Sequence, residues 1–136
     1  MAKIVKNKST TKIGKASKLK QKFPIVRICL KATPNNSIAV LTDLEGKIIS
    51  WASSGKVGFK GTKKATPFAS QKVTEDMIEK AKMVEAVTAH VVINGAGAGR
   101  DSFLRTLMAS HLQIESIKDT TGFPFGGPKP ANRRRI

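Results

Sequence analysis

Apolar and polar residues alternate along the first half of the chain, which is the pattern of half-covered β-strands. Within residues 25–31, the apolar Val26, Ile28 and Leu30 fall on one side of an extended chain. Segments rich in asparagine, aspartate, proline and glycine follow, and such residues favour turns. The pattern predicts three antiparallel strands over residues 25–31, 37–42 and 47–52, joined by turns at 33–36 and 43–46.

After Thr66, the spacing of the apolar residues changes from that of a strand to that of a helix. A threonine followed by proline is typical of a helix start, because the hydroxyl caps a backbone N–H and proline has no N–H to leave unpaired. Apolar residues then recur at spacings of three and four, which predicts an amphipathic helix that packs on a sheet. The members of this stripe are Ala69, Val73, Met77, Ala81 and Val84.

The remaining elements are a strand over residues 88–93, a shorter helix and a last strand over residues 114–118. The apolar stripe of the shorter helix contains Phe103, Leu104, Leu107 and Met108. Two strand–helix–strand units in succession imply parallel neighbours with right-handed connections. The sequence therefore predicts an α/β fold: a mixed five-stranded sheet in the order 3-2-1-4-5, with helices packed on it.

The charge is high and unevenly distributed. The 136 residues carry a net charge of +16, and acids are missing from residues 1–42, 46–74 and 120–136. Such an excess points to nucleic acid as partner, whereas the basic residues do not form the amphipathic helix of a membrane-surface protein. We expect three parts: a basic N-terminal extension (1–23), an α/β RNA-binding domain (24–119) and a basic C-terminal tail rich in proline and glycine (120–136).

The sequence disfavours a disulfide, a metal site, a membrane span and a catalytic site. Cys29 is the single cysteine, so neither an intramolecular disulfide nor the spacing of a metal site is present. No apolar run approaches a membrane span and no secretory signal is recognisable, so we expect a soluble, intracellular protein. His90 and His111 are isolated, and no nucleophile has an identifiable base. We expect no catalytic residue, no metal and no cofactor.

The segment from Ser50 to Phe68 is the strongest candidate for a binding site. Its glycines allow close approach of the backbone to phosphates, its lysines neutralise them, and Phe59 offers an apolar face to a base. The alternative is a mobile surface loop without a ligand. We expect Trp51 to lie in the core and to anchor the base of this loop.

The run GAGAGR at residues 95–100 lies between a strand and a helix. Its spacing is wrong for a dinucleotide-binding fingerprint, because Arg100 stands where the third glycine is required. The glycines fit a tight turn, and N–H groups at the helix start together with Arg100 would form a phosphate site. An enzyme that binds a nucleotide through Gly97 is the alternative from another functional class, and a general nucleic-acid chaperone is a third hypothesis.

Four segments, SWASSGKVGFKG, KKATPFAS, NGAGAGRDS and IKDTTGFPFGGPKPANRRR, occur in this order. With them, residues 24–136 closely resemble the universal family of the eleventh protein of the small ribosomal subunit, in its bacterial or organellar form. The resemblance implies a ribonuclease-H-like three-layer α/β fold and a structural role without catalysis. It also implies a place in the ribosome of a bacterial cytoplasm or of a mitochondrion or plastid. There the family binds small-subunit ribosomal RNA on the platform near the messenger exit side, next to other platform proteins, and we expect messenger RNA close by.

The same resemblance implies which residues contact RNA. Matching motifs place Asn35 and Asn36 in the first turn, and Gly97, Gly99 and Arg100 at the second helix. The tail contributes Lys129, Arg133, Arg134 and Arg135, and we expect the divergent Phe125 to stack or pack within it. The loop contributes Ser53, Ser54, Gly55, Lys56, Gly58, Phe59, Lys60, Gly61, Lys63 and Lys64.

Overall fold

The computed structural model describes residues 22–132, in which strands and helices follow the predicted order. Their bounds differ from the predicted ones by about one residue, as is usual for element ends. The strands are β1 (Ile25–Ala32), β2 (Ser37–Thr42), β3 (Ile48–Ser53), β4 (Thr88–Asn94) and β5 (Gln113–Asp119). The helices are α2 (Pro67–Met83), α3 (Gly99–Met108) and a short 3₁₀-helix, η1 (Gly61–Ala65), which the sequence pattern did not predict.

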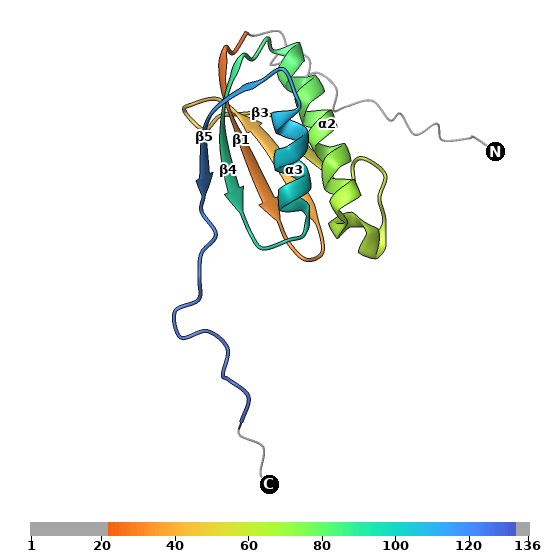
Figure 1. The fold of residues 1–136 in the computed structure, drawn as a ribbon, viewed down its shortest axis with the longest axis vertical. Coiled ribbons are helices and arrows are strands. Elements are labelled where there is room, and N and C mark those ends of the chain that lie inside the picture. The colour runs from red at the N-terminus through yellow and green to blue at the C-terminus, as the bar shows by residue number, and fades with distance from the viewer. Residues whose placement is uncertain (1–21, 133–136) are drawn as a thin grey trace, which may run out of the picture.

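The strands form one sheet in the order β3-β2-β1-β4-β5, which confirms the predicted order (Figure 1). The pairs β1–β2 and β2–β3 are antiparallel, whereas β1–β4 and β4–β5 are parallel. The crossover from β3 to β4 contains α2, and the crossover from β4 to β5 contains α3. The mixed sheet thus follows from a meander of hairpins and two helical crossovers.

Helix α2 starts as predicted. The side-chain oxygen of Thr66 accepts a hydrogen bond from the backbone N–H of Ala69 at 3.3 Å, and Pro67 occupies the first turn. All five residues of the predicted stripe are at most 1% exposed, and all except Ala69 belong to the hydrophobic core that includes alternate residues of the strands. Burial of this stripe fixes which side of α2 faces the sheet.

Helix α3 is only partly as predicted. Phe103 and Leu107 are fully buried, but Met108 is 62% exposed. Adjacent helical residues differ by about 100° around the axis, so Met108 points away from the side that holds Leu107. Leu104 lies at the margin of the core.

Both α-helices lie on the same face of the sheet, side by side (Figure 1). The hydroxyl of Ser70 in α2 donates to the carbonyl of Gly99 in α3 at 2.9 Å, which joins the two helices where they begin. Residues 22–132 therefore form one helical layer and one sheet layer, and they supply no third layer. The other sheet face, with Arg27, Lys31 and Trp51, is open in the described part of the chain.

The predicted boundaries of the domain remain predictions. Phe23 already belongs to the folded part, because its backbone N–H donates to the carbonyl of Val84 at 2.9 Å. After Asp119 the chain leaves the sheet and extends away from it (Figure 1). Most of the predicted N-terminal extension and the last four residues of the tail lie outside the described residues.

Candidate nucleic-acid interface

Segments far apart in the sequence meet at one end of the sheet, where β1, β4 and β5 end and β2 begins (Figure 1). The backbone N–H of Ser54, in the basic loop (residues 54–66), donates to the carbonyl of Ser37 at 3.0 Å. The backbone N–H of Gly97, in the glycine loop (residues 95–98), donates to the carbonyl of Ala32 at 3.1 Å. We call this region the loop end and define it as residues 33–36, 54–68, 95–98 and 120–121.

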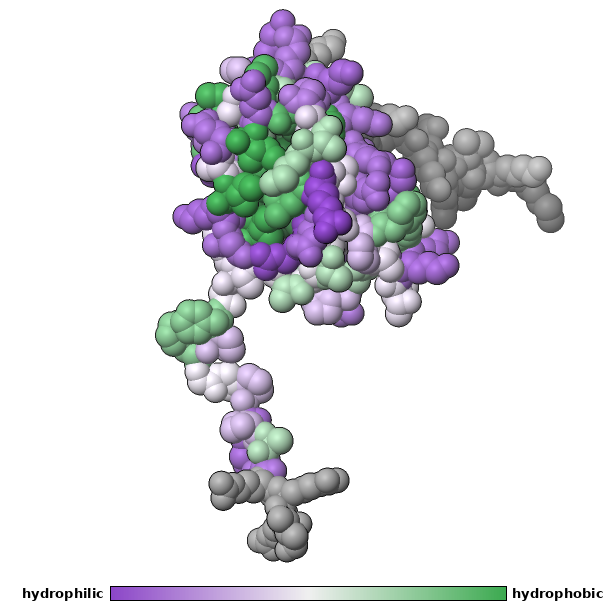
Figure 2. Space-filling model, viewed as in Figure 1, coloured by the Kyte–Doolittle hydropathy of each residue, from purple (hydrophilic) through white to green (hydrophobic). Residues whose placement is uncertain are grey.

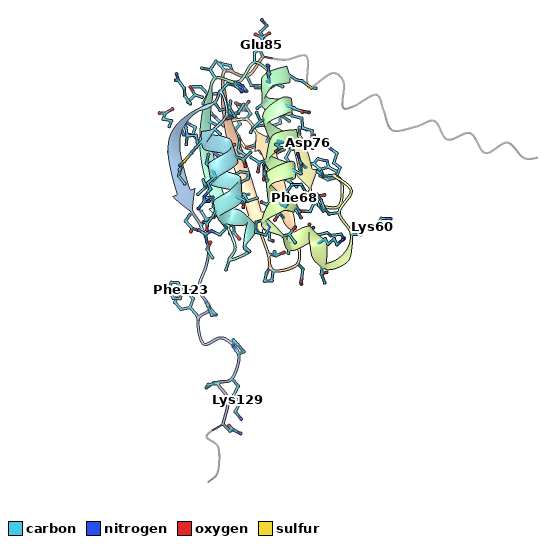
Figure 3. All side chains as sticks on the ribbon, turned by 45° about the vertical axis from the view of Figure 1, so that its right-hand side comes forward. Lys60, Phe68, Asp76, Glu85, Phe123 and Lys129 are labelled. Atoms are coloured by element: carbon cyan, nitrogen blue, oxygen red, sulfur yellow. The ribbon has the colours of Figure 1, made fainter. Side chains whose placement is uncertain are left out.

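Both α-helices also begin at the loop end, α2 at Pro67 and α3 at Gly99. The first turn of a helix has unsatisfied N–H groups and carries a partial positive charge. The opposite end of the domain, marked by Glu85 in Figure 3, lies beyond the carboxyl end of α2. The backbone alone therefore makes the loop end the more positive of the two.

The basic loop has a defined backbone. The N–H groups of Val57 and Phe59 donate to the carbonyls of Ser53 and Ser54, both at 3.1 Å, and η1 follows. The side chain of Val57 packs against the hydrophobic core. These contacts hold the predicted positions of the loop in one arrangement, with Gly55, Lys56, Gly58 and Gly61 exposed and Ser53 half-buried.

The lysines of the loop lie on its outer side. Lys60 and Lys63 are exposed, Lys64 is partly exposed, and Lys60 points away from the domain (Figure 3). Within residues 22–132, no carboxylate lies within ion-pair distance of these three ammonium groups. Their charge is therefore not neutralised by the folded domain and can act on an external anion.

The prediction that Trp51 lies in the core is wrong. Its neighbour Ala52 is fully buried, and because successive strand residues point to opposite faces, Trp51 projects from the open face and is 42% exposed. The ammonium group of Lys56 lies 4.9 Å from the centroid of its ring and donates to its backbone carbonyl at 3.0 Å. Lys56 thus rests over an aromatic ring beside the loop.

Two phenylalanines lie together at the loop end. The rings of Phe59 and Phe68 meet edge to face with centroids 5.9 Å apart. Phe68, labelled in Figure 3, is 57% exposed, whereas Phe59 is partly buried. Of these two residues, only Phe59 was predicted from the sequence to contact RNA. Phe68 could have been found from the sequence, because it is an apolar residue in the first turn of α2 that lies outside the buried stripe.

Three predicted RNA-contacting residues are buried: Ser54, Gly97 and Gly99. A Cβ atom on Gly97 would lie 2.6 Å from the carbonyl oxygen of Thr33, and one on Gly99 would lie 2.6 Å from the Cβ of Ser70. These residues let loop and helix approach the rest of the domain closely. Their burial shows that they shape the loop end by close packing, and their contact with RNA stays a prediction.

The predicted phosphate site at the glycine loop is occupied by contacts within the protein. The guanidinium group of Arg100 donates to the carbonyl of Gly95 at 3.0 Å and pairs with the carboxylate of Asp119. The backbone N–H of Gly97 is already bonded to the end of β1. Close packing thus accounts for the glycines, and the nucleotide-binding alternative gains no support.

The two asparagines of the first turn have different environments. The carboxamide oxygen of Asn36 accepts the backbone N–H of Ser37 at 3.0 Å, and the N–H of Asn36 donates to the hydroxyl of Thr33 at 3.0 Å. Asn35 is exposed at the tip. Asn36 therefore stabilises the turn, and Asn35 is the member that faces outward.

Asp119 connects the glycine loop to the start of the tail. The hydroxyl of Thr121 donates to its carboxylate at 2.6 Å and the backbone N–H of Thr121 donates at 2.9 Å. Together with the Arg100 guanidinium, these bonds lower the pKa of Asp119 from 3.8 to about 2. The hydroxyl of Thr121 also accepts the backbone N–H of Gly95 at 3.1 Å.

We expect this junction to remain intact in mildly acidic solution. Because the pKa of Asp119 is lower in the folded protein, its contribution is fully present above pH 3.8 and is lost as the pH falls through about 2. A carbon-detected NMR titration of the carboxyl group measures this pKa. Thr121→Val should raise it more than Arg100→Gln does, and a midpoint near 3.8 in the unaltered protein would contradict the assignment.

The tail presents basic and aromatic side chains away from the sheet (Figure 3). Lys129 is exposed, and Arg133, Arg134 and Arg135 lie outside the described residues. The rings of Phe123 and Phe125 have centroids 5.1 Å apart, and Phe125 is 92% exposed. Phe125 therefore packs on Phe123 within the tail while keeping most of its surface accessible.

Other kinds of site find no support in the described part of the chain. Residues 22–132 contain no cluster of histidine, cysteine, aspartate or glutamate that could hold a metal ion. None of their helices has the length and apolar character needed to cross a membrane. His90 hydrogen-bonds to the hydroxyl of Ser116 at 2.8 Å and lies 3.7 Å from the carboxylate of Glu115, on the sheet rather than at the loop end.

Comparison with known proteins identifies the family of this chain. The family model described as ribosomal protein S11 matches residues 25–135. The small ribosomal subunit protein uS11c of Cyanidium caldarium is 44% identical over 121 residues, which cover 89% of this chain and 94% of that protein. Protein uS11 of Treponema pallidum (strain Nichols) is 45% identical over 109 residues, 80% of this chain and 86% of that protein. Protein uS11c of Mesostigma viride is 40% identical over 129 residues, 95% of this chain and 98% of that protein. The chain belongs to the ribosomal protein S11 family and is a structural protein of the small ribosomal subunit, not an enzyme.

Proposed function

We propose that the protein binds small-subunit ribosomal RNA through its loop end and thereby supports assembly of the subunit and translation. The observation that carries this proposal is the convergence of four separate segments with two helix N-termini at one end of the sheet. An RNA backbone that lies against this end meets the lysines of residues 54–66 and the partial positive charge of both helix N-termini.

The side chains at the loop end suit RNA better than a small anion. Lys60, Lys63 and Lys64 lack carboxylate partners within the described residues, so they gain from neutralising phosphates. The exposed ring of Phe68 offers a surface for stacking against an unpaired base. A row of charges with one aromatic group fits an extended polyanion that carries bases.

The location within the subunit is also part of the proposal. Membership in the family supports a place on the platform near the messenger exit side, next to other platform proteins and close to messenger RNA. In that setting the tail, with Lys129 and its terminal arginines, adds a second contact to RNA.

The salt dependence of binding tests the proposal. A contact based on phosphates releases about 0.9 cations per phosphate neutralised, so log K should fall with log salt at a slope steeper than about −3. The measurement is a titration of the full chain with a platform fragment of small-subunit RNA at several salt concentrations. A slope near zero would refute RNA binding by charge, and equal competition by an unrelated RNA of the same length would instead indicate a general chaperone.

A further inference from the structure

An apolar strip runs along β5 and the adjoining side of α3. We define it as Leu104, Met108, Ile114 and Ile117. Ile114 pairs with Ala89 and Ile117 with Val91, both of which are fully buried beneath the helices. The strip thus continues the covered face of the sheet past the helical layer, where Ile117 is 46% and Met108 62% exposed. Figure 2 shows apolar side chains gathered over this part of the molecule.

The charge around the strip differs from that of the whole chain. Within residues 99–119, the basic Arg100, Arg105 and Lys118 are balanced by Asp101, Glu115 and Asp119. The protein as a whole carries +16. A neutral, apolar surface has little to offer a phosphate backbone, whereas it is typical of the centre of a protein–protein contact.

The strip borders a free strand edge. The strand order ends at β5, so within residues 22–132 its outer edge pairs with no other strand. Lysine side chains cover the opposite edge of the sheet, which is formed by β3. The ammonium groups of Lys56 and Lys80 both donate to the carbonyl of Trp51 in this strand at 3.0 Å. Lysines that cover an edge oppose the addition of a further strand, and within residues 22–132 no lysine donates to a backbone carbonyl of β5 in this way.

We propose that β5 and the apolar strip dock an extended segment of a neighbouring protein of the small subunit. The segment adds a strand to the outer edge of β5 through backbone hydrogen bonds, and its alternate apolar side chains lie on Ile117 and Met108. This surface is separate from the loop end. The proposal rests on membership in the small subunit and not on RNA contact at the loop end.

Photocrosslinking in complete small subunits tests the proposal. The photoreactive residue p-benzoylphenylalanine replaces Ile117 in one variant and Thr62, in η1, in another. We expect the variant at Ile117 to crosslink to a protein, whereas crosslinking to RNA alone, or no crosslink, would overturn the proposal. The variant at Thr62 should crosslink to RNA, and its failure would count against the loop-end proposal without affecting this one.

A pair of matched variants tests the energetic role of the strip. Ile117→Lys and Leu44→Lys introduce the same charge at positions that are both 46% exposed, and Leu44 lies in the turn between β2 and β3. When each competes with unaltered protein during subunit reconstitution, Ile117→Lys should be incorporated about tenfold less than Leu44→Lys, as for the loss of one central interface anchor. Thermal unfolding of the free variants serves as the folding control. Equal incorporation of two folded variants would overturn the proposal.

Discussion

Replacing Lys60 and Lys63 with glutamine should weaken binding of small-subunit RNA about 50-fold at roughly 0.1 M salt, and should reduce the slope of log K against log salt by about 1.8. Both side chains are exposed on the outer side of the basic loop and lack carboxylate partners in the described part of the chain. The proposed interface assigns one RNA phosphate to each of these two lysines. Filter binding or fluorescence anisotropy at several salt concentrations measures both quantities.

The matched control removes the same charge at the opposite end of the domain. Lys47 precedes β3 and Lys82 lies near the carboxyl end of α2, and both are exposed. Because the net charge changes equally, Lys47→Gln with Lys82→Gln isolates the effect of position. Similar losses in the two double variants would mean that binding follows net charge alone, and RNA contact at the loop end would be wrong.

Gly95→Ala should destabilise the fold by more than about 3 kcal/mol, which is among the largest effects of a single methyl group. Gly95 has a φ of +97°, and a Cβ at this position would lie 2.0 Å from the carbonyl oxygen of Ala32. The glycine loop therefore has to move away from the end of β1 or the backbone has to distort. Chemical denaturation followed by circular dichroism measures the loss.

Two other glycines distinguish the two causes of this loss of stability, the unfavourable backbone conformation and the steric clash. Gly46 has a similar φ of +86° but no atom within 4 Å of a Cβ, so Gly46→Ala carries only the conformational penalty of about 1–2 kcal/mol. Gly55 has neither a positive φ nor a close contact, and Gly55→Ala should change stability little. If Gly95→Ala were no worse than Gly46→Ala, the tight packing of the glycine loop would be refuted.

The fold was largely predictable because its signals are local. Alternation of Val26, Ile28 and Leu30 fixed the buried face of β1, and Thr66 with Pro67 fixed the start of α2. The order of the strands followed from the two helical crossovers. Such periods and caps are properties of short segments, so one sequence suffices to find them.

The sequence did not reveal environments that depend on distant parts of the chain. Trp51 is hydrophobic enough for a core, but its strand position places it on a face that no described element covers. Arg100 has the chemistry of a phosphate ligand, yet Asp119 at the end of β5 pairs with it. A single sequence does not reveal such partners, because they are brought together only by the sheet order.

The candidate site was predicted in part for the same reason. The composition of the basic loop identified its exposed lysines correctly, but not the burial of Ser54 nor the pairing of Phe59 with Phe68. Convergence of the segments at the loop end follows from the parallel pairing of β1 and β4, which puts their carboxyl ends together. That convergence places the lysines of the basic loop and the N-termini of both α-helices on one surface.

Directed cleavage of ribosomal RNA in assembled small subunits tests the RNA-binding surface most directly. An iron chelate is tethered to a cysteine introduced at Thr62, at the loop end, or at Glu45, at the opposite end, after the half-buried Cys29 is replaced by serine. Hydroxyl radicals from the chelate cut RNA that lies close to it. We predict strong cleavage at defined sites from Thr62→Cys and little from Glu45→Cys. Equal cleavage from both positions, or stronger cleavage from Glu45→Cys, would contradict RNA binding at the loop end.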